Sequence, residues 1–192
     1  MAGFGKISAA VLCLSVMSGV GRAQEVAARI KTRVYNMAKV RPAVLSGGLS
    51  EAGTIFKRIG IEIEWAECPC NSLVSAAELQ LRVIPTLFPT LGGIPQRGHL
   101  GYAAASEQGG GLATIFYDRV EDLTIEVKPS TVLGYAIAHE LGHLLLPVNA
   151  HASDGIMRAH WDPKLISRAG GFLSFAPDQG RLLRLRVASR EP

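Results

Sequence analysis

The segment 138–146 contains the pattern H-E-x-x-H, formed here by His139, Glu140 and His143. On an α-helix, residues four positions apart lie on the same face, so two imidazoles at this spacing can bind one metal ion. Almost every residue from 131 to 146 is apolar or small, which predicts a helix buried on most sides. A chance pair of hydrogen-bonded core histidines is the alternative, but the residues around the pattern favour a metal centre.

Residues outside the helix are needed to complete such a centre. A catalytic zinc ion usually has three protein ligands and one position open for water. The helix is expected to end before Pro147, because the residue preceding a proline is pushed out of the helical conformation. Asn149 tolerates the left-handed conformation of a sharp turn, and His151 follows at once. Glu140 is expected to lie beside the metal ion, where it can accept a proton from metal-bound water.

This arrangement resembles the metzincin clan of zinc endopeptidases, which carry H-E-x-x-H-x-x-G-x-x-H followed by a turn containing methionine. The matching residues are His139, Glu140, His143, His151 and Met157. The resemblance covers residues 30–190 and implies an α+β fold: a mixed, twisted sheet with an active-site helix, a methionine turn and a C-terminal helix. It also implies a Zn²⁺ ion that is held by the three histidines.

The turn after the helix departs from the pattern of the clan. The glycine of the clan would fall at Leu146 and its third histidine at Asn149, so two additional residues precede His151. His151 is the predicted third ligand. Asp154 and His160 are the alternatives, since a carboxylate can also bind zinc.

The first residues of the 192-residue chain predict a secretory signal peptide at 1–23 and a single domain at 24–192. Lys6 precedes an apolar run at 7–20, and small residues flank Arg22 before the expected cleavage after Ala23. The run is short for a membrane span, and an uncleaved anchor is the alternative. We therefore expect a secreted or periplasmic protein with no stable membrane insertion after cleavage.

The charge of the mature chain argues against nucleic-acid binding. Removal of residues 1–23 leaves 18 basic and 16 acidic residues, a net charge of +2. Such a mild excess lacks the electrostatic footprint that binds a phosphate backbone. The oligomeric state is left open.

Two cysteines remain in the mature chain, Cys68 and Cys70, with a proline between them. They are too few for a structural zinc site, which needs four ligands. A strained disulfide between them, free thiols and an intermolecular bridge are all left open.

The remaining elements follow from hydrophobic periodicity. Apolar residues recur at helical spacing in 49–60, and a final helix is expected to begin near Pro177, with Arg181, Arg184, Arg186 and Arg190 on its outer face. Alternation predicts strands at 30–36, 61–65, 79–85, 99–104 and 113–120. The region from 147 to about 163 is expected to be a loop.

Together these features predict a secreted zinc-dependent endopeptidase that acts on peptide or protein substrates. By the resemblance, the strand at 100–104 would line the cleft, and Arg158, Ala159 and His160 would shape the pocket beyond the scissile bond. The competing hypothesis is a catalytically silent binding module of the same fold that keeps zinc for stability. Glu140 favours catalysis, because a purely structural zinc ion needs no general base.

Overall fold

The computed structural model describes residues 28–68, 74–85, 99–105, 111–124, 127–147, 150–161, 163–168 and 173–190. The predicted signal peptide at 1–23, Cys70 and Asn149 lie outside these residues. Cleavage after Ala23 therefore stays a prediction. Among the helices that the structure describes, none is long and apolar enough to span a membrane.

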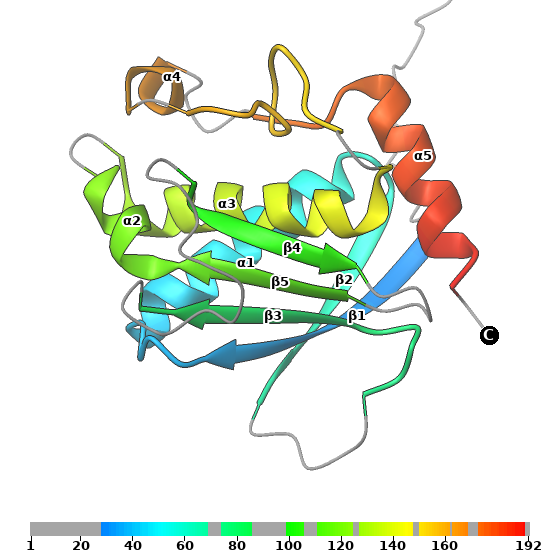
Figure 1. Cartoon of the computed structure of the whole chain (residues 1–192), viewed down its shortest axis with the longest axis horizontal. Coiled ribbons are helices and arrows are strands. Elements are labelled where there is room, and N and C mark those ends of the chain that lie inside the picture. Colours follow the sequence, from blue (N-terminus) through cyan, green and yellow to red (C-terminus); the bar gives the residue numbers. More distant parts are fainter. Residues whose placement is uncertain are drawn as a thin grey trace, which may run out of the picture.

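The described elements form a mixed sheet with helices packed against it (Figure 1). In chain order they are β1 (Ala28–Asn36), α1 (Pro42–Lys57), β2 (Ile61–Glu67), β3 (Leu79–Ile84), β4 (Gly101–Ala105), β5 (Gly111–Phe116), α2 (Tyr117–Asp122), α3 (Pro129–Leu145), α4 (Pro163–Arg168) and α5 (Pro177–Ala188). The strand order is β2-β1-β3-β5-β4, with β4 antiparallel to β5 and the other neighbours parallel. The predicted mixed sheet with helices is confirmed.

The core lies between the sheet and the two long helices, α1 and α3, which lie side by side against it (Figure 1). Alternate residues of a strand point to the same face, so the inward side chains of β1 and β3 form an apolar layer. Ile30, Val34, Leu81 and Val83 are all buried there. Helix α5 lies at one end of the molecule, and α2 and α4 lie at the other (Figure 1).

Helix α1 begins seven residues earlier than the predicted start at 49, at Pro42, and passes through Gly47 and Gly48. Proline fits the first turn of a helix, where its missing N–H has no partner to lose. The two glycines are not a break, because they allow α3 to approach closely. A Cβ atom on Gly48 would lie 2.8 Å from the Leu133 side chain. The helix starts earlier than predicted because close helix packing outweighs the low helix propensity of glycine.

The predicted strand at 113–120 was too long at its C-terminal end. Strand β5 ends at Phe116, and α2 begins at Tyr117. The helical turn buries Tyr117 and Val120, which are three residues apart and lie on one side of a helix. The short helix α4 begins at Pro163, where the predicted loop was expected to end. This helix was not predicted from the sequence.

Helix α5 was predicted correctly in position, but not all of its arginines face outward. The Nη1 atom of Arg184 donates a hydrogen bond to the carbonyl oxygen of Ile59 at 2.8 Å, and Arg190 is half-buried. Arg181 and Arg186 are exposed as predicted. Leu185 on the same helix is 63% exposed, so the apolar residues of α5 are shared between the core and the surface.

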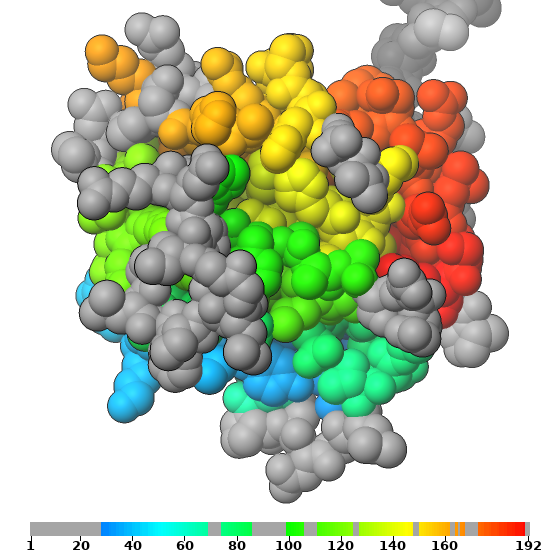
Figure 2. Space-filling model, viewed as in Figure 1, coloured from blue at the N-terminus to red at the C-terminus, as the bar shows by residue number. Residues whose placement is uncertain are grey.

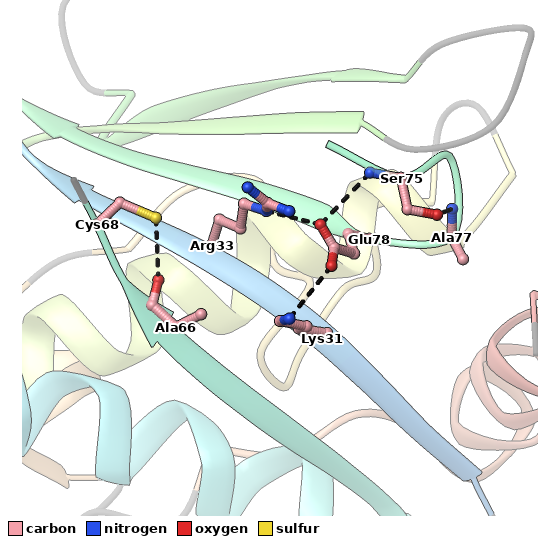
Figure 3. A network of polar contacts seen from close by, with 7 residues as sticks. All are labelled: Lys31, Arg33, Ala66, Cys68, Ser75, Ala77 and Glu78. Atoms are coloured by element: carbon pink, nitrogen blue, oxygen red, sulfur yellow. Dashed lines mark hydrogen bonds and ion pairs between the residues drawn. The ribbon is translucent and has the colours of Figure 1, made fainter. Parts of the chain in front are cut away.

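A polar network joins β1 to the turn before β3 (Figure 3). The carboxylate of Glu78 lies 2.6 Å from Nε of the buried Arg33 and 3.4 Å from Nζ of Lys31. The hydrogen bond from Arg33 lowers the pKa of Glu78, so the carboxylate stays ionised beside its partners. This network anchors the strand that follows Glu78 to the middle of the sheet.

Cys68 lies just after β2, and its Sγ atom is 3.4 Å from the carbonyl oxygen of Ala66 (Figure 3). The structure records Cys68 as disulfide-bonded, which excludes a free thiol at this residue. Since Cys70 lies outside the described residues, the pairing of the two cysteines stays open.

Candidate metal centre

Helix α3 places the H-E-x-x-H residues in the interior of the molecule. It runs from Pro129 to Leu145, close to the predicted 131–146, and most of its residues are buried. Gly134 packs directly against α1, since a Cβ atom there would lie 2.5 Å from the Cβ atom of Glu51. This close packing holds the helix in place beneath the site.

Three histidine nitrogens converge at the C-terminal half of α3. The Nε2 atom of His143 lies 3.0 Å from Nε2 of His139 and 3.1 Å from Nε2 of His151. His139, His143 and His151 form a group whose potential ligand atoms all lie within 4.8 Å of one another. Among the described residues, neither Asp154 nor His160 belongs to this group, and His151 as third ligand stays a prediction.

Hydrogen bonding shows which nitrogen of His139 is free. Its Nδ1 atom lies 2.8 Å from the carbonyl oxygen of Ile156. A carbonyl can only accept, so Nδ1 carries the proton and donates it, and Nε2 presents a lone pair to the cluster. A second contact that orients the ring in this way is usual for metal-binding histidines.

The cluster fits a metal ion better than a set of hydrogen bonds. His143 Nε2 faces two other ring nitrogens, but a neutral imidazole can donate at most one proton from that atom. Tetrahedral zinc with Zn–N bonds of 2.0–2.1 Å separates its ligand nitrogens by about 3.3 Å. The observed separations of 3.0 and 3.1 Å are close to that value, so these residues fit a Zn²⁺ ion.

The two histidines of the helix are held in the protonation state that a metal requires. Burial lowers the pKa of His139 to about 4, despite the opposing hydrogen bond to Ile156. Burial, assisted by the neighbouring His139 and His151, lowers the pKa of His143 to about 4. Both rings are therefore neutral at physiological pH, and neutral imidazole is the form that binds zinc.

The chain after α3 turns beneath the site and is tied to it by backbone hydrogen bonds. Gly155 has a φ of +70°, a conformation that favours glycine, and a Cβ atom there would lie 2.6 Å from the Ser174 carbonyl oxygen. The N–H of Ile156 donates to the same oxygen at 2.9 Å. Ile156 thus connects the turn both to the segment before α5 and to His139.

Met157 lies in this turn, directly against the metal-binding helix. It is fully buried, and a Cβ atom on Gly142 would lie 2.7 Å from its sulfur atom. The same atom would lie 2.9 Å from the ring of Phe175. The glycine within H-E-x-x-H therefore makes room for the methionine, and the turn that contains Met157 packs against α3 beside His139.

Glu140 lies in the wall of a pocket beside the histidines, and His139 lines the same pocket. Its side chain is buried, and burial raises its pKa to about 8. A cation at the histidines would lower that pKa, because a nearby positive charge favours the ionised carboxylate. In Figure 2, α3 reaches the surface between β4 and the segment that follows the helix.

Several residues that build this pocket were not singled out from the sequence. A Cβ atom on Gly101 would lie 2.9 Å from Cγ of Glu140, so the first residue of β4 must be small. Ala136 lines the pocket three residues before His139, a spacing that could have revealed it. Trp161 also lines it and carries no signal in the sequence that would have shown this. His99, which was expected to be an ordinary residue at the start of a strand, lines it as well.

Comparison with solved structures places this fold among known proteins. A zinc-dependent peptidase from Methanocorpusculum labreanum superposes with a TM-score of 0.52 at 14% identity, over 79% of this chain and 99% of that one. Metalloproteinase-II from Bacteroides fragilis superposes with a TM-score of 0.53 at 11% identity, over 87% of this chain. This chain therefore shares its overall fold with these two proteins.

The extent of the likeness differs between the two structures. The match spans 99% of the zinc-dependent peptidase but only 55% of the metalloproteinase. No protein-family model matches the sequence, and no curated protein matches it either. At these identities the likeness concerns the fold, so the chemistry rests on the histidines, Glu140 and the pocket.

Proposed function

We propose that this protein is a zinc-dependent endopeptidase. The observation that carries the proposal is the convergence of three histidine Nε2 atoms beside a pocket that holds one buried carboxylate. A purely structural zinc site is usually closed by four protein ligands, whereas a catalytic site keeps a position open. The group at this site contains three residues, His139, His143 and His151.

Each residue has a distinct role in the proposed reaction. His139, His143 and His151 would hold the metal ion, and the hydrogen bond from His139 to Ile156 would fix its ring. A bound zinc ion supplies Lewis acidity, which polarises the peptide carbonyl and lowers the pKa of a water molecule. Glu140 would take a proton from the attacking water and return it to the departing amine.

The sheet offers a position for the substrate next to these groups. Strand β4 stands at the end of the strand order and pairs with β5 on one side. An extended peptide can add to such an edge through backbone hydrogen bonds. Leu100, just before this strand, lines the pocket beside Glu140, so a peptide on β4 would pass the reactive groups.

We assign the protein to the metzincin-like peptidases within this proposal. The support is the turn at 152–158, whose buried Met157 packs against the helix that carries the histidines. The alternative is a silent binding module of the same fold, and the two additional residues before His151 favour it. The buried Glu140, placed beside the histidines and in the pocket, favours the enzyme.

Chelation tests the proposed activity. We expect the zinc-loaded protein to cleave a broad peptide library, to lose that cleavage in the presence of a chelator, and to regain it when zinc is restored. Mass spectrometry of the products would identify the cleavage sites. If zinc-loaded protein cleaves none of the library, the binding module is the better hypothesis.

Export is the second part of the proposal, supported by the basic and apolar start of the chain. We expect N-terminal sequencing of the protein collected outside the cytoplasm to begin at Gln24, since cleavage after Ala23 removes the signal peptide. Exported protein that retains Met1 would instead support an uncleaved anchor.

A further inference from the structure

The pocket beside the histidines has a positively charged residue in its wall that the proposed reaction does not use. Among the described residues, the wall contains His99, Leu100, Ala136, Arg158, Ala159 and Trp161 besides His139 and Glu140. Glu140 is the one carboxylate among these lining residues. Arg158 is permanently charged, because a guanidinium group does not lose its proton in a protein.

The backbone of Arg158 is held in the turn beside the pocket by its hydrogen bonds. The guanidinium group of Arg158 has no acidic partner in the described part of the chain. The backbone N–H of Arg158 donates to the carbonyl oxygen of Gly155 at 3.4 Å. Arg158 also pairs with Ala152 in an isolated β-bridge, so Arg158 belongs to the turn that follows α3. None of the ion pairs between β1 and the residues beside it involves Arg158. Its side chain is exposed to solvent.

A second arginine near the pocket, Arg119, has a different role, because its side chain binds other groups of the protein. Arg119 donates from Nη1 to the carbonyl oxygen of His99 at 2.7 Å and stacks over the Phe116 ring at 4.6 Å. Arg119 thus supports the segment that carries His99. Arg158 lines the pocket itself.

The other residues of the wall can contact the methylene groups of a short substrate side chain. Leu100, Ala136, Ala159 and Trp161 offer apolar surface to the methylene groups of a side chain. A ligand whose methylene groups contact these residues and whose end is a carboxylate would match both the apolar residues and the charged arginine. Arg158 can then bind the carboxylate through charge-assisted hydrogen bonds.

We propose that this pocket binds a carboxylate of the substrate and that Arg158 is the residue that selects it. The inference rests on the proposed function, because it places the carboxylate next to the bond to be cleaved. Two sources share this chemistry: an aspartate or glutamate side chain, and the free α-carboxylate at the end of a peptide. Arg158 is here a specificity-determining residue and takes no part in bond cleavage.

Matched peptides test the inference. Peptides that differ only in glutamate or glutamine at one position, with amidated ends, report on side-chain carboxylates. A peptide without acidic side chains, prepared with a free or an amidated C-terminus, reports on the α-carboxylate. We expect zinc-loaded wild type to favour one carboxylate peptide over its neutral partner by about tenfold or more in kcat/KM, the usual worth of a hydrogen bond to a charged group.

Variants of the arginine connect the preference to the pocket. Arg158→Gln should abolish the preference, and Arg158→Glu should reverse it toward peptides with lysine at the same position. Arg186→Glu is the matched control, because Arg186 is an exposed arginine on α5, at the far end of the molecule from α2 and α4 (Figure 1). Zinc content and the thermal midpoint are measured for each variant, so misfolded protein is recognised.

Binding separates this inference from the proposed activity. Fluorescence anisotropy of the same peptides on the zinc-loaded Glu140→Gln variant, with and without Arg158→Gln, measures the preference without turnover. Cleavage without a carboxylate preference, or with one that Arg158→Gln leaves intact, overturns the inference while the peptidase stands. Absence of cleavage together with an Arg158-dependent binding preference overturns the peptidase and supports the pocket. Absence of both overturns both.

Discussion

Replacing Glu140 with glutamine is expected to lower peptide hydrolysis by about a hundredfold or more, the usual contribution of general acid–base catalysis. Glutamine keeps the size and shape of the side chain but cannot accept a proton. The closely packed Gly101 next to Cγ of Glu140 leaves the isosteric amide in the same place. Zinc binding should survive, because Glu140 is not one of the three grouped histidines.

The measurement compares kcat/KM and zinc content of wild type and variant on a peptide that the wild type cleaves. Asp122→Asn serves as the control, since it removes an exposed carboxylate at the end of α2 and should change neither quantity. Turnover that continues undiminished in the Glu140→Gln variant would contradict the role of this residue. That result would not contradict the assignment of the three histidines as metal ligands.

Replacing His151 with alanine is expected to weaken zinc binding more than any other change after the helix. The loss should exceed the roughly 10–100-fold that removal of a supporting partner of a ligand costs, because a ligand itself is removed. His139 and His143 would remain, held by α3 and, for His139, by the hydrogen bond to Ile156. Two ligands alone do not complete a site of this kind.

Asp154→Ala and His160→Ala are the matched controls for this experiment. Both residues belong to the same segment as His151 and were alternatives for the third ligand, yet neither joins the histidine group in the described structure. Zinc content after dialysis against a chelator, followed by titration of the apo protein with zinc, compares the three variants. Full occupancy in the His151 variant, with loss in either control, would reject the assignment.

The metal-binding helix could be predicted from the sequence because its determinants are local. The spacing of His139 and His143 fixes their shared face wherever a helix forms, and the apolar residues around them require burial. The first strands were predicted for the same reason: alternation at 30–36, 61–65 and 79–85 depends only on neighbouring residues. The order of the expected strands and helices, together with the resemblance to metzincins, supplied the expectation of a mixed sheet.

Contacts between distant segments decided what local patterns could not. Gly47 and Gly48 remain helical in α1 because α3 packs against them, and a local pattern cannot show that neighbour. The pocket joins His99, Ala136 and Arg158 from three separate segments of the chain. Propensity and periodicity describe residues a few positions apart, whereas a pocket wall forms when packing brings remote residues within a few ångströms. The helix and its histidines were therefore predicted from local sequence, and the resemblance to metzincins placed Arg158 and Ala159 at the pocket. Only the tertiary structure showed that Ala136 and Trp161 complete the surroundings of Glu140, because these residues are brought together by packing.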